Sequence, residues 1–581
     1  MANTDKTLAQ KCVPDVADRT DKERASDVLV RRLAQLGVTR VFGIPGGPIS
    51  PVTDALFGSG IEHVTCQHES MAVYAATGYA RATGVPSVVL VTSGPGVLNA
   101  LTALAAAYHD EAPVVLLVGE VATVSAGKGV LQDGGESGLR IHQMVAPISK
   151  YADTLDIPAR IESMIDAAFE CAMEHPRGPV VLQLPVDICA ATAGGASFRL
   201  RTPPQILGGN LPPNESLCAE IADALVSARR PLILVGGPGG RSGAAAELRA
   251  LAEATACPVA TDLEGKGVFP ESHPLSMGIW GVGSRGRVAE YLAGGIDFLL
   301  TVGARLDDTT TLNFNPLLIP SGTFAQIDYD PRRLGRAFAP SIMLAADIPL
   351  TLSRIHEHVY VDRLTLARRE SAVQPLNRVV PAPEVTSPGA FDPRIIIRNL
   401  QSAFRHDTVY VSDIGNHLLF AGSGLELELP DQFHVSMGLG GMGSGIGMGI
   451  GLAAAYQGTR NVVVVCGDGG MLMCGTELAT AVRYGFPVTV VVMNDACLGM
   501  VQHGSERVYG RSADWRTPPV DFVAFARSLG LAATRLTDTA QFAEFAHGNR
   551  LRPQLIEVPI DLAVRPVNPR DETLNFPSEV A

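Results

Sequence analysis

The sequence predicts three α/β domains, stacked one after another, each built on an open and mainly parallel sheet. Short β-branched runs bounded by glycine or proline recur along the chain, and helical patterns separate them, as in parallel sheets. Two stretches rich in proline, residues 195–215 and 373–394, divide this alternation into three similar parts. The length of 581 residues also suits about three domains of ordinary size.

The first domain is predicted at residues 25–190, after a polar tail of residues 1–24. A helix is expected from Ala25 to Gly37. Continuous apolar runs then predict buried strands, which we place at Arg40–Gly43, Val88–Thr92, Val114–Gly119 and Val180–Pro185. The second domain is predicted at residues 205–358, and its strands are placed at Pro231–Val235, Val259–Thr261, Phe298–Val302 and Thr323–Ile327.

A linker, residues 359–392, leads to the third domain at residues 393–565, and residues 566–581 form a C-terminal tail. The expected strands of this domain are Thr408–Ser412, Asn461–Cys466, Val488–Asn494 and Gln554–Val558.

Composition and charge argue against nucleic-acid-binding and membrane proteins. The net charge is −13 and no run of Lys and Arg is visible, so we expect no nucleic-acid partner. The nine cysteines are scattered without a CxxC pair, which is typical of free thiols in a reducing compartment. The N-terminus has no apolar signal segment, and no 18-residue apolar run lacks polar breaks. We therefore expect a cytoplasmic protein without a membrane partner.

One motif in the third domain points to a metal and a diphosphate. Asp468 follows a buried strand inside Gly467-Asp-Gly469, and Asn494 ends the next strand. Ligands of open α/β sheets bind at the carboxyl ends of the strands, so both side chains should share one crevice. A carboxylate and an amide oxygen suit Mg²⁺, which completes its shell with phosphate oxygens and water. Gly467, Gly469 and Gly470 leave room for a diphosphate at the N-terminus of the following helix.

A competing interpretation is a dinucleotide site. Gly438–Gly443 fits GxGxxG after the strand-like His434–Ser436, and Asp468 lies about 25 residues later. This pattern would suit a nicotinamide dehydrogenase. The dinucleotide interpretation does not explain the GDG motif or Asn494, so we favour a site that binds a metal and a diphosphate.

GDG followed by 24 residues and then Asn-Asp resembles the thiamine diphosphate motif. The resemblance implies that Asp468, Asn494 and the backbone oxygen of Ala496 bind Mg²⁺. Without this resemblance, Asp468 would be interpreted as a helix-capping residue and Asn494 as a turn residue.

The first domain carries a partner motif. Alone, Glu69 would be an acid favoured by the dipole of its helix. HExxAxxAAxGYARxTG, residues 68–84, followed by TSGPG resembles the pyrimidine-binding domain of the acetolactate synthase group. The resemblance implies that Glu69 hydrogen-bonds N1′ of the aminopyrimidine and favours its imino tautomer. That nitrogen then removes the thiazolium C2 proton, and the cofactor acts as an electron sink.

The resemblance covers roughly residues 25–565, and the middle domain joins it through GKGVFPESHPLSMGIWG, GARLDD and IDYDP. It implies that Met442 props the cofactor in a V shape. It also implies that the two rings of one cofactor lie across a subunit interface, in a homodimer at least and a homotetramer by analogy. The implied cofactor-binding residues are Glu69, Pro45, Gly46, Gly440, Met442, Gly467, Asp468, Gly469, Gly470, Asn494, Leu498, Gly499 and Met500.

Three positions depart from synthases of branched-chain amino acid synthesis. Thr309 replaces the Arg of GARFDDR, whose bidentate fork binds a carboxylate. Gly504 replaces the Trp that narrows the acceptor pocket. The FQE segment is lost: counting back from Pro147–Lys150 puts Ser137 where a Gln would approach the thiazolium, and Gln132 is the alternative. His503 lies in the acceptor region and is a candidate for proton transfer.

These departures predict a transferase or lyase that adds an acyl unit from a 2-oxo acid such as pyruvate to a non-standard carbonyl acceptor. The alternatives are an acetolactate synthase using two pyruvates, a 2-oxo acid decarboxylase or oxidase, and a scaffold without chemistry. FAD is a further candidate cofactor, because the Gly236–Gly240 turn could accommodate an ADP diphosphate. However, Trp280 replaces the family's His in MLGMHG.

Overall fold

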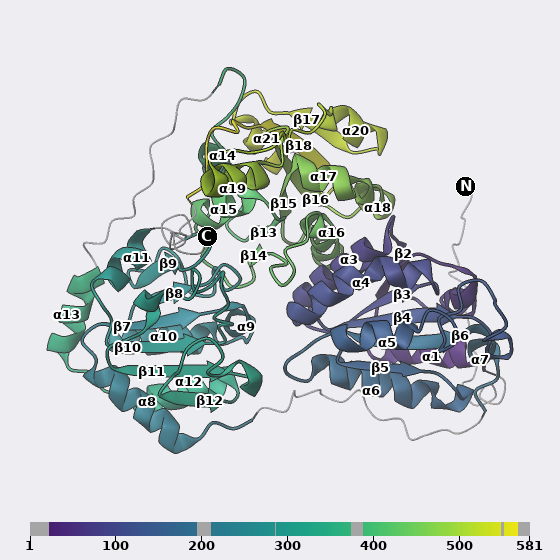
Figure 1. Cartoon of the computed structure of the whole chain (residues 1–581), viewed down its shortest axis with the longest axis horizontal. Coiled ribbons are helices and arrows are strands. Elements are labelled where there is room, and N and C mark those ends of the chain that lie inside the picture. Colours follow the sequence, from purple (N-terminus) through teal and green to yellow (C-terminus); the bar gives the residue numbers. More distant parts are fainter. Residues whose placement is uncertain (1–22, 195–210, 285, 374–386, 548–550, 568–581) are drawn as a thin grey trace, which may run out of the picture.

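The computed structural model of the chain describes residues 23–194, 211–284, 286–373, 387–547 and 551–567. The predicted tails and much of the predicted linkers lie outside these residues. Figure 1 shows three α/β domains at the corners of a triangle, with the third domain above the other two. Among the described helices, none is both long and apolar enough to span a membrane.

The first sheet has the strand order β2-β1-β3-β4-β6-β5, and all its strands are parallel. Its strands are β1 Arg40–Gly43, β2 Glu62–Thr65, β3 Ser87–Val91, β4 Val114–Glu120, β5 Tyr151–Thr154 and β6 Val180–Pro185. Its helices are α1 Ala25–Gln35, α2 Ser50–Ala55, α3 Glu69–Thr83, α4 Pro95–His109, α5 Ile141–Val145, α6 Ile161–Met173 and α7 Val186–Ala190.

The middle sheet has the order β12-β11-β10-β7-β8-β9, again parallel throughout. Its strands are β7 Pro231–Val235, β8 Val259–Thr261, β9 Ser276–Ile279, β10 Phe298–Val302, β11 Thr323–Asp328 and β12 Ile342–Ala345. Its helices are α8 Glu215–Ser227, α9 Gly237–Gly240, α10 Ala245–Thr255, α11 Gly286–Ala293, α12 Ile348–Glu357 and α13 Arg363–Val373.

The third sheet, β14-β13-β15-β16-β18-β17, repeats the order of the first. Its strands are β13 Val409–Ser412, β14 Phe433–His434, β15 Val462–Gly467, β16 Val488–Asn494, β17 Ala532–Arg535 and β18 Gln554–Pro559. Its helices are α14 Pro393–Ala403, α15 Asn416–Gly424, α16 Ser444–Tyr456, α17 Asp468–Cys474, α18 Leu478–Tyr484, α19 Gly499–Tyr509, α20 Phe522–Ser528 and α21 Gln541–His547. The predicted fold class of three α/β domains is confirmed, while the exact domain boundaries stay predictions.

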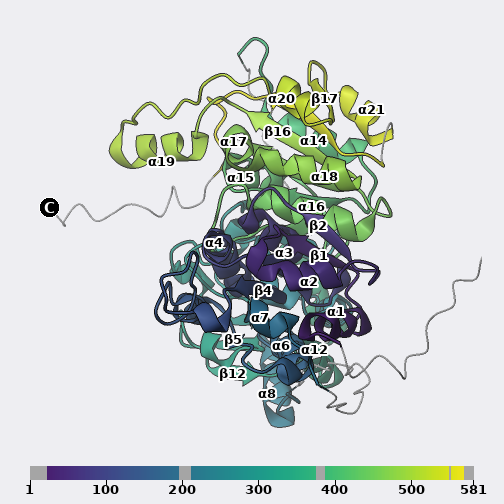
Figure 2. The same ribbon diagram turned by 90° about the vertical axis from the view of Figure 1, so that its right-hand side faces the viewer.

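Helices α3 and α16 join the first domain to the third, and they lie side by side in Figures 1 and 2. Both are lined with small residues, so their backbones approach closely. A Cβ atom on Gly78 would overlap the Met448 carbonyl oxygen, and one on Gly451 would overlap that of Ala75. One apolar core therefore runs through both domains.

Gly451→Ala should lower the free energy of unfolding by roughly 1–3 kcal/mol, because the added methyl forces the two helices apart. Gly286→Ala is the matched control, since its Cβ would meet open space. Denaturant unfolding of both variants measures the difference. Equal stability of the two variants would contradict the close contact.

A buried acid of the third domain also contacts the first domain. Glu477, in the short 3-10 helix η8 (Gly475–Glu477) after α17, accepts a hydrogen bond of 2.9 Å from the Gln67 backbone N–H. Its side chain is 1% exposed. Burial raises the pKa of Glu477 to about 7, although hydrogen bonds from Thr480 and the Gln67 backbone oppose this.

This raised pKa predicts a pH-dependent stability. Because the folded protein holds the Glu477 proton more tightly, the contribution is fully present below the unfolded pKa of 4.5 and is lost as pH rises through about 7. Glu477→Gln should therefore gain stability relative to the wild type between pH 5 and pH 8, a window set by about these two pKa values. Urea midpoints across that range measure it, and a constant difference would refute the assignment.

Candidate active site

The two residues of the GDG and Asn-Asp motifs lie at the carboxyl ends of neighbouring strands. Asp468 begins α17 directly after β15, and Asn494 ends β16. The two strands pair in parallel, with Gly467 opposite Met493. In this third sheet β14 lies on one side of β13 and β15 lies on the other, so the strand order switches between β13 and β15. Open α/β sheets bind ligands at such a switch point.

Hydrogen bonds orient the oxygens of the predicted metal ligands. The Asn494 Nδ2 donates to Glu557 Oε1 at 2.9 Å, which turns Oδ1 toward the Ala496 N–H at 3.0 Å. Ala496 adopts φ 52°, a left-handed conformation that is rare for residues other than glycine. Thr517 joins both sides of the site, because its Oγ1 donates to Asp468 Oδ2 at 2.9 Å and its N–H donates to the Ala496 carbonyl.

The charge of this crevice fits a bound cation. Burial raises the pKa of Asp468, and burial followed by the nearby Asp468 charge raises that of Asp495 to about 7. A buried and a half-buried carboxyl are thus held near each other, where a divalent cation would favour their charged forms. Among the described residues, no cluster of three or more His, Cys, Asp or Glu side chains could hold a metal. A Mg²⁺ site would therefore use Asp468, Asn494 and the Ala496 carbonyl, completed by phosphate and water.

Other predicted residues pack closely against the glycines of the GDG turn. A Cβ atom on Gly469 would lie 2.8 Å from Leu498 Cδ2 and 2.9 Å from Met442 Cε. A Cβ on Gly470 would overlap an Asp413 carboxylate oxygen, while Gly440 has open space and φ 61°. The structure thus brings Met442, Leu498 and the glycine turn together at one wall of the crevice.

Two residues that follow β13 complete the crevice. The buried Asp413 accepts hydrogen bonds from the N–H groups of Gly443 and Gly445, at 2.9 and 3.1 Å, and so fixes the start of α16. His417 lies in the first turn of α15, and its Nδ1 would be 3.2 Å from a Cβ on Gly467. His417 Nε2 is buried without a hydrogen-bond partner, and burial lowers its pKa to about 4. A buried neutral nitrogen beside the glycine turn fits a polar ligand such as a diphosphate.

Of the predicted residues at the start of α19, Gly499 lies near the predicted metal ligands and Met500 is exposed. Gly499 lies against Asp495 and Asn416, while the Met500 side chain is 37% exposed. His503 hydrogen-bonds Asn416 through Nδ1 at 3.0 Å and the Leu562 carbonyl through Nε2 at 2.9 Å. Both ring nitrogens are engaged, so this geometry favours a structural role for His503 over proton transfer.

In the first domain, predicted residues gather where β1, β3 and β4 end. A Cβ on Gly46 would lie 2.6 Å from Thr92, so Pro45 and Gly46 lie beside the end of β3. Glu69 begins α3, is 7% exposed, and accepts a hydrogen bond of 3.0 Å from Asn99 Nδ2 of α4.

The structure separates the two candidates for the lost FQE glutamine. Gln132 lies against Gly94, whose Cβ would be 3.0 Å from Gln132 Cγ, at the N-terminus of α4. Ser137 is exposed and hydrogen-bonds the Asp133 carboxylate. Gln132 therefore lies at the end of β3, among the predicted first-domain residues, and Ser137 does not.

Within one chain, the two halves of the site do not meet at a single point. The start of α3 contacts η8 through the Gln67–Glu477 hydrogen bond. Asp468 lies at the opposite end of α17, which η8 follows. Glu69 and Asp468 of one chain are thus held at different ends of this helical segment.

The middle domain has two features that bear on FAD. Its strand order is that of dinucleotide-binding folds, with β7 at the centre. However, the glycine turn after β7 is closed: the Gly237 N–H donates to Asp262 at 3.3 Å, and a Cβ on Gly237 would overlap Glu264. The N–H groups of Gly236, Gly239 and Gly240 bond backbone carbonyls. The turn therefore does not fit a diphosphate, contrary to our expectation.

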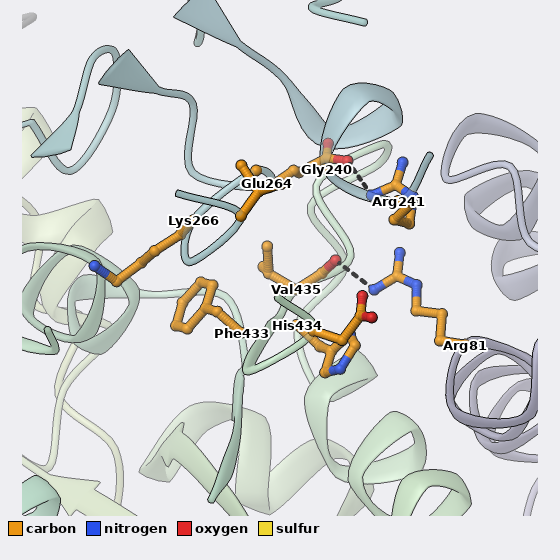
Figure 3. Close-up of a pocket in the computed structure, with 11 residues that line it drawn as sticks. Arg81, Gly240, Arg241, Glu264, Lys266, Phe433, His434 and Val435 are labelled. Carbon is orange, nitrogen blue, oxygen red and sulfur yellow. Dashed lines mark hydrogen bonds and ion pairs between the residues drawn. The ribbon is translucent and has the colours of Figure 1, made fainter. Parts of the chain in front are cut away.

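Figure 3 shows a small polar pocket where the three domains meet. Arg81 of α3 donates to the Val435 carbonyl at 3.1 Å, and Arg241 pairs with Glu264 at 3.2 Å (Figure 3). The cavity of about 20 Å³ has room for little more than water. A larger cavity of about 1030 Å³ lies between the first and middle domains and is bordered by Thr309, Arg305 and Arg177.

Comparisons with known proteins agree with this geometry. Family models of the thiamine pyrophosphate enzymes match at residues 23–137 (N-terminal TPP binding domain), 218–355 (central domain) and 413–558 (C-terminal TPP binding domain). A probable acetolactate synthase large subunit of Methanocaldococcus jannaschii is 32% identical, over 93% of this chain and 92% of its own length. The acetolactate synthase isozyme 3 large subunit of Escherichia coli is also 32% identical, over 87% and 88%.

Among solved structures, a benzoylformate decarboxylase from Polynucleobacter necessarius superposes with a TM-score of 0.82 at 22% identity, over 94% of this chain and all of its own. At that identity it supports the fold alone. From the three matched domains and the long curated relatives, we conclude that the chain belongs to the thiamine pyrophosphate-dependent enzymes and is similar to acetolactate synthases over most of its length.

Proposed function

We propose that the protein is a Mg²⁺- and thiamine diphosphate-dependent carboligase that transfers an acyl unit from a 2-oxo acid such as pyruvate to a carbonyl acceptor. The observation that carries the proposal is the arrangement at the ends of β15 and β16. There Thr517 hydrogen-bonds both Asp468 and the Ala496 carbonyl, and Asn494 Oδ1 accepts from the Ala496 N–H. When bound, the cofactor supplies a carbanion and an electron sink. Asp468 and Asn494 would hold the metal, His417 and the turn would bind the diphosphate, and Met442 would support the rings.

The roles of the first-domain residues complete the proposal. Glu69 would hold a proton at the pyrimidine end, and burial beside Asn99 keeps it in one orientation. Since Glu69 and Asp468 of one chain lie at different ends of α17 and η8, a second copy is needed to bring an acid to each crevice. Exposed apolar side chains on α17 and α19 support such a contact, and Figure 2 shows α19 projecting from the side of the third domain. We therefore propose a homodimer at least.

Two positions support a non-standard acceptor. Thr309 Oγ1 donates to Asp307 at 2.6 Å, so this side chain is engaged locally and offers no cationic fork to a carboxylate. A Cβ atom on Gly504 would meet nothing within 4 Å, so the acceptor side of α19 is open. An acceptor larger than pyruvate, or one without a carboxylate, fits these features. Formation of acetolactate from two pyruvates is the second candidate, favoured by the curated relatives.

FAD stays a prediction for the middle domain. The closed glycine turn does not support it, so no step of the proposed reaction uses a flavin. Flavin absorbance of the purified protein measures this directly.

Incubation of the purified protein with pyruvate, thiamine diphosphate and Mg²⁺ should yield ligated products with a panel of aldehydes, ketones and diketones. Mass spectrometry identifies the products. We expect at least one acceptor to be used roughly tenfold faster than pyruvate itself, because the loss of one directional carboxylate contact is worth about 1.5–3 kcal/mol. Fast acetolactate formation from pyruvate alone would contradict the acceptor proposal and leave the cofactor proposal standing.

Asp468→Ala should lower turnover by roughly 100-fold or more, since even changes next to a metal ligand cost 10–100-fold. It should also abolish the thermal stabilisation that thiamine diphosphate with Mg²⁺ gives the wild type. Asp223→Ala, an exposed aspartate of α8, is the matched control. A variant that keeps full activity and full stabilisation would refute the metal assignment.

A further inference from the structure

A loop of the first domain, residues 121–140, follows β4 and carries Gln132. This residue has φ 65°, a left-handed conformation that costs free energy for a residue with a side chain. Its Cγ and Cβ would lie 3.0 and 3.1 Å from a Cβ on Gly94, so the side chain lies against the TSGPG turn. Surrounding contacts must hold Gln132 in this conformation.

Ser93 supplies one such contact. Its hydroxyl lies 2.6 Å from the Gln132 carbonyl oxygen and 3.1 Å from Glu120 Oε1. Both partners are acceptors, so the single hydroxyl proton is shared between them. Ser93 is completely buried, and its oxygen therefore has no water to replace either partner.

Glu120 accepts the hydrogen bonds that connect the loop to the end of β4. It ends β4 and is 6% exposed. Its Oε1 accepts from the N–H groups of Val121 at 2.8 Å and Gly134 at 3.0 Å, and Oε2 accepts from Gln183 Nε2 at 3.3 Å. One carboxylate thus binds the loop at its first residue and again two residues after Gln132. A Cβ on Gly134 would overlap Glu120 Oε2, so only glycine permits this approach.

The location of Glu120 links the loop to the site. Gly119, the preceding residue, lies so close to η2 (Gly47–Ile49) that a Cβ on it would be 2.5 Å from the Ile49 nitrogen. Pro45 and Gly46 immediately precede η2. The carboxylate therefore fixes the loop relative to the same strand ends at which the pyrimidine half of the site is built.

We infer that Glu120 is a positioning residue that holds Gln132, through Ser93 and Gly134, in the orientation needed toward the substrate. The inference rests on the proposed function for its catalytic consequence, because Gln132 would contact the reacting molecules. Its structural part, that one buried carboxylate sets the conformation of the loop, stands independently of the reaction. Ser137 lies on the exposed side of the loop, where it hydrogen-bonds Asp133.

Glu120→Ala, Gln132→Ala and the double variant test this inference. Glu120→Gln is the conservative replacement, and Asp223→Ala, at an exposed residue of α8, is the control. Loss of the carboxylate should lower kcat/KM roughly 10- to 100-fold, because displacement of a substrate-orienting group by about 1 Å has that effect. Glu120→Gln keeps an acceptor oxygen for Val121 and Gly134 and should restore most of the activity. Glu120→Ala should have little further effect in the Gln132→Ala background.

Amide hydrogen exchange gives a readout that needs no activity. Peptides covering residues 121–134 should exchange faster in Glu120→Ala than in the wild type, while peptides of α6 and α8 stay unchanged. Unchanged exchange in the loop overturns the inference. So does an equal loss from Glu120→Ala with and without Gln132, which would mean general damage. If the wild type shows no thiamine diphosphate-dependent turnover, the proposed function fails, and the exchange result still decides the role of Glu120.

Discussion

The close contact of α3 with α16 is the constraint on which the rest of the structure depends. Gly78 and Gly451 let the two backbones touch, and a bulkier residue at either position would separate the first domain from the third. Helix α3 begins with Glu69, and α16 follows the glycine run that carries Met442. The packing of these two helices therefore fixes where the predicted pyrimidine-side acid and the predicted metal ligands lie relative to each other within one chain.

Much of the fold could be predicted because the central strands are buried on both faces. β3, β4, β7 and β10 are continuous apolar runs, and the predicted positions agree with the structure to within a residue or two. The edge strands were mostly missed. β2, β5 and β17 are only four residues long and partly exposed, so their residues follow no continuous apolar pattern. Only the edge strand β14 had been noted, as the strand-like His434–Ser436.

Site residues could be predicted from the sequence where their positions depend only on the ends of neighbouring strands. Asp468 and Asn494 lie together because β15 and β16 are neighbours, which the order of motifs implies. Thr517 could not be predicted, since an irregular segment about fifty residues away brings it to Asp468. The sequence leaves both Ser137 and Gln132 open for a related reason. Counting back from Pro147 assumes a fixed loop length, whereas hydrogen bonds to Glu120 and Asp133 determine the path of this loop.

The middle domain and the glycine run of the third show why strand order and sequence motif do not by themselves define a ligand site. The middle sheet has the order of dinucleotide-binding folds, yet Asp262 accepts the Gly237 N–H and Glu264 fills the space beside the glycine turn. Gly438–Gly443 fits GxGxxG, yet it follows the edge strand β14, and the Gly438 and Gly443 N–H groups bond Asp110 and Asp413. In the middle domain, Asp262 and backbone carbonyls take the N–H groups of the turn, and in the third domain Asp110 and Asp413 take those of Gly438 and Gly443. The GDG turn differs, because it lies beside a buried histidine nitrogen and beside carboxyls that a cation would stabilise.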